Sequence, residues 1–188
     1  FLTQLLTAFQ RKNPLVSFSV YSGNSDNIKE RIERGLLDVG LLQEPVDITK
    51  YSFIRTPIRE QWGVLVNENS ELAAKNNVSP ADLSDIPLIM PGRENLQNEL
   101  FNWFGSYAEN LHVIANGNLL YNLASLARDS GACVLTLNMA CSYPGLCFVP
   151  LSPEMETGTV LVWKKTQTFS PVASAFIDYS KKYILGIF

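Results

Sequence analysis

The sequence has few of the residues from which enzymes and metal centres are usually built. Its 188 residues include one histidine, His112, and three cysteines. His112 has no cysteine or acidic partner at metal-ligand spacing, and no pattern pairs it with a serine and an aspartate for nucleophilic catalysis. Glycine-rich phosphate loops of the two standard spacings are also missing. We therefore expect neither an enzyme nor a metal site, and no cofactor.

Excess positive charge and long apolar runs are missing as well. There are 15 lysines and arginines against 18 acidic residues, so the formal net charge is −3 and no basic face is available for nucleic-acid phosphates. No apolar run approaches the ~18 residues that a membrane span needs. The chain starts at Phe1 inside a helical pattern, without an initiator methionine or a signal peptide. We therefore expect a piece of a longer protein.

The three cysteines are an odd number and show no spacing typical of a disulfide framework, which favours a reducing cytoplasm. Cys141 and Cys147 flank a loop with Pro144 and Gly145, and such a loop can bend the two thiols together. A redox switch between these thiols and ordinary packing as small apolar residues both stay open.

The segment Pro14–Leu42 carries the most information. Over residues 16–20, apolar side chains alternate with serines, which is the period-2 pattern of a half-buried strand. The polar run Ser22–Asp26 then turns the chain and supplies helix caps. An amphipathic helix follows, and Gly35 fits the position just after its end. The apolar run 36–42 is typical of a strand buried in a parallel sheet.

Strands and helices alternate along the rest of the chain as well. Ser79-Pro80-Ala81-Asp82 predicts a helix start, because serine caps, proline fits the first turn and aspartate faces the positive end of the helix dipole. Ser170-Pro171 predicts the start of the last helix. The other predicted strands are 51–58, 62–66, 88–90, 111–115, 133–137, 148–149 and 160–163.

Two polar breaks, at residues 67–70 and 150–158, divide this series. The alternation predicts an α/β fold of two Rossmann-like lobes with mostly parallel sheets, joined by two crossover segments. A strand, a polar turn and a helix in that order aim free N–H groups at one edge of a sheet, where small ligands bind. We expect the binding site in the cleft between the lobes.

Several pieces of the chain, in the right order, resemble the effector-binding domain of LysR-type transcriptional regulators. The resemblance covers nearly the whole chain, and each piece alone is short. The pieces are Leu5, Leu6, Phe9, Asn13, Pro14 and Val16, then Gly23-Asn24-Ser25, Gly35 to Leu41, Asp82-Leu83, Pro87-Leu88-Ile89, Leu161-Val162-Trp163, Ser170-Pro171 and Phe176.

The resemblance implies a type II periplasmic-binding-protein fold, with lobe I at residues 1–67 plus 157–188 and lobe II at 68–156. It also implies a bacterial sensor that holds a small metabolite between the lobes and passes its presence to a DNA-bound oligomer. In such a protein we expect a cytoplasmic homodimer or homotetramer. DNA would be bound only through an N-terminal helix-turn-helix that this chain does not contain, and no membrane would be involved.

In lobe I the candidate ligand-binding residues are Ser22, Asn24, Ser25 and Gln43. Asn24 and Ser25 join short polar side chains to helix N–H groups, which suits a carboxylate or a similar anion. Simple capping of the helix by one of them is the alternative. Gln43 follows a buried strand and can fix the orientation of a ligand, or it is a solvated loop amide.

In lobe II the first candidates are the run Met90, Pro91, Gly92 and Arg93 at the end of a strand. Gly92 permits a close backbone approach, and the Arg93 guanidinium offers a bidentate fork to an anion. An ordinary surface arginine at a helix start is the alternative.

The other candidates in lobe II are Asn116, Asn118 and Thr136. Asn118 is the expected cap of the next helix, and Asn116 can close on a ligand or simply form a turn. Thr136 ends a strand beside the expected cleft.

Two other functions stay open from the sequence. One is an extracytoplasmic solute-binding protein of a transport system, which would carry a signal peptide or a lipid anchor upstream. The other is an enzyme on the same fold, although no catalytic constellation is visible.

Overall fold

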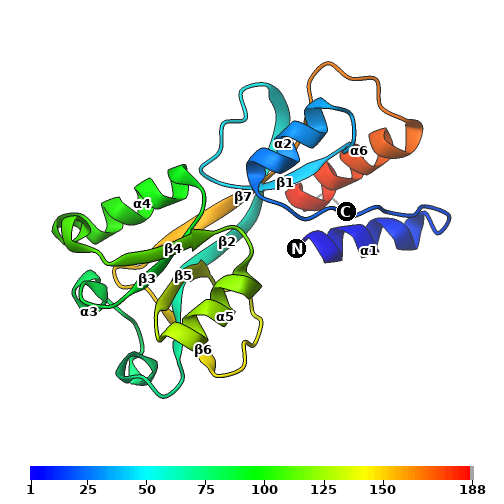
Figure 1. The fold of residues 1–188 in the computed structure, drawn as a ribbon. Helices are drawn as coiled ribbons and strands as arrows, with labels where there is room; N and C mark the ends of the chain where they lie inside the picture. Colours follow the sequence, from blue (N-terminus) through cyan, green and yellow to red (C-terminus); the bar gives the residue numbers. More distant parts are fainter. Residues whose placement is uncertain (187–188) are drawn as a thin grey trace. The chain divides into compact units, whose positions relative to one another are not determined.

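Two strands carry the chain between the two units of the fold in the computed structural model, which describes residues 1–186 (Figure 1). Unit 1 comprises Phe1–Arg59 and the residues from Gly158 on, and unit 2 comprises Glu60–Thr157. Strand β2 (Tyr51–Asn67) starts in unit 1 and ends in unit 2, and β7 (Glu156–Lys164) returns the chain. The α/β class is confirmed. Within residues 1–186, no helix has both the length and the apolarity that crossing a bilayer requires.

Aromatic side chains join the first and last helices of unit 1, α1 (Leu2–Lys12) and α6 (Pro171–Leu185), which lie side by side in Figure 1. The Phe9 ring meets the Phe176 ring edge to face, with centroids 5.2 Å apart and planes at 89°, and it meets Tyr179 at 5.3 Å. Such pairs add roughly 0.5–1.5 kcal/mol beyond the area that they bury. This cluster holds α1 on α6.

Helix α2 (Ser25–Glu33) packs directly on the backbone of β1 (Gly40–Gln43). Its apolar stripe buries Ile28 and Ile32, and a Cβ atom on Gly40 would lie only 2.6 Å from Ile28 Cγ2. Strand β1 in turn pairs antiparallel with β7. The predicted glycine after the helix is confirmed, since Gly35 has a φ of 71°.

The strand predicted over residues 16–20 is wrong, because these residues are extended but join no ladder. The half-buried face of the pattern is nevertheless present: Val16 and Phe18 are half-buried, and the Phe18 ring lies 6.2 Å from Phe9 and 5.7 Å from Phe176. The side chains of this segment are thus held by the aromatic cluster rather than by a sheet. The strand predicted over 36–42 starts only at Gly40.

The sheet of unit 2 is mixed, with the order β2-β5-β3-β4 and with β6 (Leu146–Pro150) beside β2. Strand β3 (Leu88–Pro91) runs parallel to β4 (Val113–Gly117) and to β5 (Cys133–Leu137), whereas β2 is antiparallel to β5 and β6. The prediction of mostly parallel sheets is therefore corrected. The long strand that enters unit 2 runs against its neighbours, and it is continuous where the sequence predicts two strands.

Helices cover both faces of this sheet. On one face, α4 (Glu94–Phe104) buries Leu96, Leu100 and Phe104 against Leu88 and Met90, and the 3-10 helix η2 (Gly105–Asn110) follows it. On the other face, α5 (Leu120–Ser130) packs its alanines against Ile89. The side chains of β3 thus alternate between two apolar cores, as a central strand requires.

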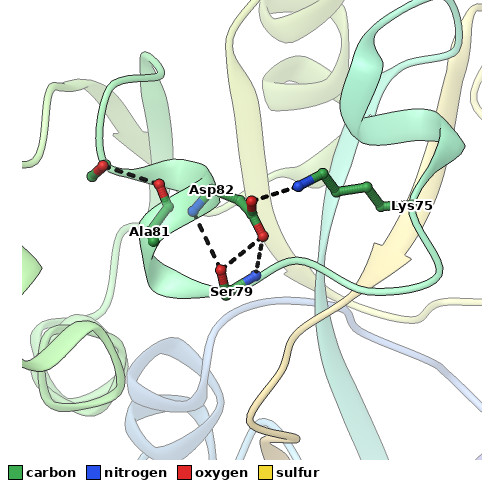
Figure 2. Close-up of polar contacts among 5 residues, drawn as sticks. Lys75, Ser79, Ala81 and Asp82 are labelled. Carbon is green, nitrogen blue, oxygen red and sulfur yellow. Dashed lines mark hydrogen bonds and ion pairs between the residues drawn. The ribbon is translucent and has the colours of Figure 1, made fainter.

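The short helix α3 (Pro80–Leu83) starts with the predicted cap, Ser79 (Figure 2). Figure 2 also shows Lys75, which directly follows the 3-10 helix η1 (Glu71–Ala74). The Asp82 carboxylate accepts hydrogen bonds from the Ser79 N–H at 2.8 Å and the Ser79 hydroxyl at 2.7 Å, and Lys75 Nζ lies 2.5 Å from its other oxygen. The hydrogen bond from Lys75, followed by those from Ser79, lowers the pKa of Asp82 from 3.8 to about 2.

We expect Asp82→Asn to lower the free energy of unfolding at neutral pH by about 1 kcal/mol, because the cap loses its carboxylate. A carboxyl group with a lowered pKa in the folded chain stabilises above its ordinary pKa and stops doing so as the pH falls through the lowered value. The difference between the wild type and the variant should therefore shrink between about pH 4 and about pH 2.

Urea denaturation at several pH values measures this difference. Asp178→Asn is the matched control, because its ion pair with Lys181 lies on an exposed helix face and should contribute almost nothing. A difference between wild type and Asp82→Asn that stays constant with pH would contradict the lowered pKa.

Candidate functional site

The three parallel strands of unit 2 end at one edge of its sheet. Met90 pairs in register with Asn116, Pro91 pairs with Gly117, and β5 continues alongside to Thr136 and its last residue. In α/β sheets, ligands bind outside the carboxyl ends of parallel strands. The structure therefore brings all the candidates of lobe II to this carboxyl edge.

Two glycines bring the backbones of β3 and β4 together where the strands end. The Gly92 N–H donates to the Gly117 carbonyl oxygen at 2.7 Å, and a Cβ on Gly92 would lie 3.2 Å from that oxygen. The close backbone approach expected at Gly92 is thus present, with Gly117 as its partner. Gln97 Nε2 donates to the Pro91 carbonyl oxygen at 2.7 Å and ties the strand end to α4.

Helices α4 and α5 both begin at this edge without side-chain caps. Their N-cap residues, Arg93 and Leu119, accept no capping hydrogen bond through their side chains within residues 1–186. The prediction that Asn118 caps α5 is wrong, because the helix starts one residue later; Asn116 and Asn118 are both exposed. First-turn N–H groups have no intrahelical partner and carry partial positive charge, so they suit an anion.

Thr136 is the penultimate residue of β5, a strand that is paired on both edges, with β2 and with β3. It is half-buried on β5 opposite Gly63, and its hydroxyl donates to the carbonyl oxygen of the adjacent Leu137 at 3.3 Å. This local hydrogen bond leaves the hydroxyl oxygen as an acceptor. A ligand contact at Thr136 stays a prediction.

The candidates in unit 1 surround the start of α2 and the end of β1. Asn24 is the cap, because its Oδ1 accepts from the Asn27 N–H at 2.8 Å. Ser25 is the first residue of the helix and is only 5% exposed, whereas Ser22 is exposed. Gln43 is the half-buried last residue of β1. Capping by Asn24 is thus established, and contact of these four residues with a ligand stays a prediction.

A charged cluster beside Gln43 was not predicted. Arg55 Nε lies 2.9 Å from Glu44 Oε1, and a Cβ on Gly158 would lie 2.8 Å from Glu44 Oε2 and 3.1 Å from Arg59 Nη1. The Glu44 N–H also donates to the Gly158 carbonyl oxygen at 3.0 Å. Glu44 therefore joins the end of β1 to β2 and β7. The spacing of Arg55 and Arg59 on one face of a strand was the available signal.

Within the described residues, the cysteines and the histidine do not form a second candidate site, either for redox chemistry or for a metal. Cys141 is exposed and donates to the Met139 carbonyl oxygen at 3.3 Å, and burial raises the pKa of the Cys147 thiol, which disfavours the reactive thiolate. His112 is exposed. Within residues 1–186 no three histidine, cysteine or acidic side chains gather as metal ligands would.

Comparison with known proteins identifies the family to which this chain belongs. Residues 1–184 match the family model of the LysR substrate binding domain. The chain belongs to this family, as the ordered motifs of its sequence indicate.

Individual relatives agree with this class at low sequence identity. The HTH-type transcriptional regulator YvbU of Bacillus subtilis (strain 168) is 20% identical over 187 residues, which are 97% of this chain and 62% of that protein. The effector binding domain of QuiR in complex with shikimate superimposes with a TM-score of 0.83 at 15% identity, over 100% of this chain and 91% of that one. The regulatory domain of CcmR from Synechocystis PCC6803, in complex with 2-PG, gives 0.73 at 16% identity, over 100% and 92%.

The structures of QuiR and CcmR have the same fold as this chain. The chain spans about three fifths of the length of YvbU.

A stability measurement can distinguish two of the candidate asparagines, because Asn24 caps a helix and Asn118 does not. We expect Asn24→Ala to lower the free energy of unfolding by about 1 kcal/mol, because the Asn27 N–H loses its acceptor. Asn118→Ala should change it by no more than about 0.5 kcal/mol, because Asn118 is exposed and caps no helix. Urea denaturation of the two variants measures both values. Equal losses would contradict this assignment of the caps.

Proposed function

We propose that this chain is the ligand-sensing part of a cytoplasmic bacterial transcriptional regulator, and that it binds a small anionic metabolite. The observation that carries the proposal is the carboxyl edge of unit 2, where two uncapped helix N-termini begin beside the glycine contact of β3 and β4. Membership of the LysR substrate binding domain family supports a binding role rather than catalysis.

The donors at this edge favour an anion. In the part of the chain that the structure describes, the first turns of α4 and α5 have no side-chain cap from their N-cap residues. Arg93, the N-cap of α4, adds a guanidinium, a group that can hold a carboxylate with two hydrogen bonds. Asn116 and Asn118 supply amide groups that orient the rest of a ligand. QuiR binds shikimate, which carries a carboxylate, so a small acid is compatible with this fold.

The proposed lobes are those that the sequence predicts, with lobe I at residues 1–67 plus 157–188 and lobe II at 68–156. From lobe I, Ser22, Ser25 and Gln43 would contact the ligand, while Asn24 holds the start of α2 in place. Glu44 supports this role for Gln43, because its backbone and carboxylate tie the end of β1 to both strands that leave unit 1. Ligand binding would then change the balance between two conformations.

The output of this change is proposed to be transcription. YvbU, the relative in Bacillus subtilis, is an HTH-type transcriptional regulator and is longer than this chain. We propose that DNA is bound by a helix-turn-helix elsewhere in the full protein, and that a homodimer or homotetramer carries the signal. The family match gives no support to the alternative of a transport protein.

A thermal-shift screen tests the ligand class. Each small carboxylic acid is compared with its own neutral amide, so that size and shape stay constant while the charge is removed. An acid present at about a hundred times its dissociation constant should stabilise the chain by about 2.7 kcal/mol, and its amide should do far less.

Arg93→Gln should weaken the binding of that acid about tenfold, because a charged hydrogen bond is lost. Arg128→Gln, on the exposed last turn of α5, is the control and should leave binding unchanged. If neutral amides bind as well as their acids, or if no acid binds, the proposal of an anionic effector is wrong.

A further inference from the structure

The end of β1 is fastened to β2 and β7 by polar contacts that lie wholly in unit 1. The Glu44 N–H donates to the Gly158 carbonyl oxygen at 3.0 Å, and Glu44 Oε1 lies 2.9 Å from Arg55 Nε. Glu44 directly follows Gln43, the last residue of β1 and a candidate contact of the effector. The end of a four-residue strand opens readily unless the next residue is held. What holds Glu44 therefore also determines how firmly Gln43 is held.

Arg55 supplies the counter-charge that keeps the Glu44 carboxylate in place. The Glu44 side chain is only 24% exposed, and a carboxylate so far removed from water needs a partner. The guanidinium of Arg55 is held in turn, because its central carbon lies 5.2 Å from the centroid of the Phe53 ring. Loss of Arg55 would remove the ion pair at Oε1 and let the carboxylate turn towards water.

Gly158 makes room for the same carboxylate. A Cβ atom at this position would lie 2.8 Å from Glu44 Oε2 and 3.1 Å from Arg59 Nη1, so one of these groups would have to move. Gly158 is not among the glycines with a positive φ, and its backbone conformation therefore does not require a glycine. The space taken by Glu44 and Arg59 accounts for the missing side chain.

A buried hydrogen bond fixes the strand opposite Gln43. Thr159 is the register partner of Gln43 on β7, and its hydroxyl lies 2.7 Å from the hydroxyl of Thr56 on β2. Both threonines are buried, and a buried hydrogen bond of this kind is hard to break. Strand β7 is thus a firm support, and the position of Gln43 on it depends on Glu44.

We infer that Arg55 and Gly158 are positioning residues of the effector site. Arg55 holds the Glu44 carboxylate, Gly158 leaves space for it, and Glu44 thereby keeps Gln43 in the orientation that meets the ligand. The inference rests on the proposed function and deepens it, because it assigns a role to two residues that touch no ligand themselves.

Hydrogen exchange in the chain without ligand tests the support of β1. The Glu44 backbone N–H should exchange at least about threefold faster in Arg55→Gln and in Gly158→Ala than in the wild type, because the end of β1 opens more often. Glu30→Gln is the matched control, since it removes the ion pair of an exposed glutamate with Arg34 in the same unit. It should leave the exchange of the Glu44 N–H unchanged.

A double-mutant cycle with Gln43→Ala tests whether the support acts through Gln43. The probe for calorimetry is the acid that gives the largest shift in the thermal screen, with its neutral amide beside it. Arg55→Gln should weaken binding of the acid about threefold, because a partly exposed ion pair contributes modestly. Gly158→Ala, which changes no charge, should weaken it about equally. In the Gln43→Ala background neither change should weaken it further.

Two results would overturn the inference. One is an unchanged exchange rate of the Glu44 N–H in both variants. The other is a loss of binding that is equally large with and without Gln43, as the mere removal of positive charge near an anion would produce. If no acid binds, the proposed function fails, whereas the exchange rates, measured without ligand, still decide whether Arg55 and Gly158 hold the end of β1.

Discussion

The complete burial of the first three residues of strand β3 is the constraint on which unit 2 depends. Leu88, Ile89 and Met90 are each 0% exposed, and burying such a side chain contributes roughly 1.5–3 kcal/mol. A strand buried on both faces needs neighbours on both edges, and β3 has β4 and β5, both parallel to it. Parallel strands have their carboxyl ends at the same edge of the sheet. Because burial of β3 requires parallel neighbours here, the hydrophobic effect also determines the edge at which the polar backbone groups of the strand ends gather. The position of the candidate site is thus a consequence of packing.

Sequence reasoning succeeds here where a signal is local. The helix starts at Ser79 and Ser170 and the turn at Gly35 are all confirmed, because caps and left-handed turns depend on a few adjacent residues. The buried run 88–90 is confirmed as well, since only a central strand is apolar at every position. The same signals predicted the α/β class and the residues that reach the carboxyl edge of unit 2.

Where an element depends on distant partners, the sequence was insufficient. Residues 16–20 have a strand pattern but join no ladder, and Phe18 packs on the aromatic cluster of α1 and α6. The predicted strand 111–115 lies at 113–117, and the register of β4 against β3 shifts after Leu88. Glu44 and Gly158 meet across more than a hundred residues. No local pattern contains such information.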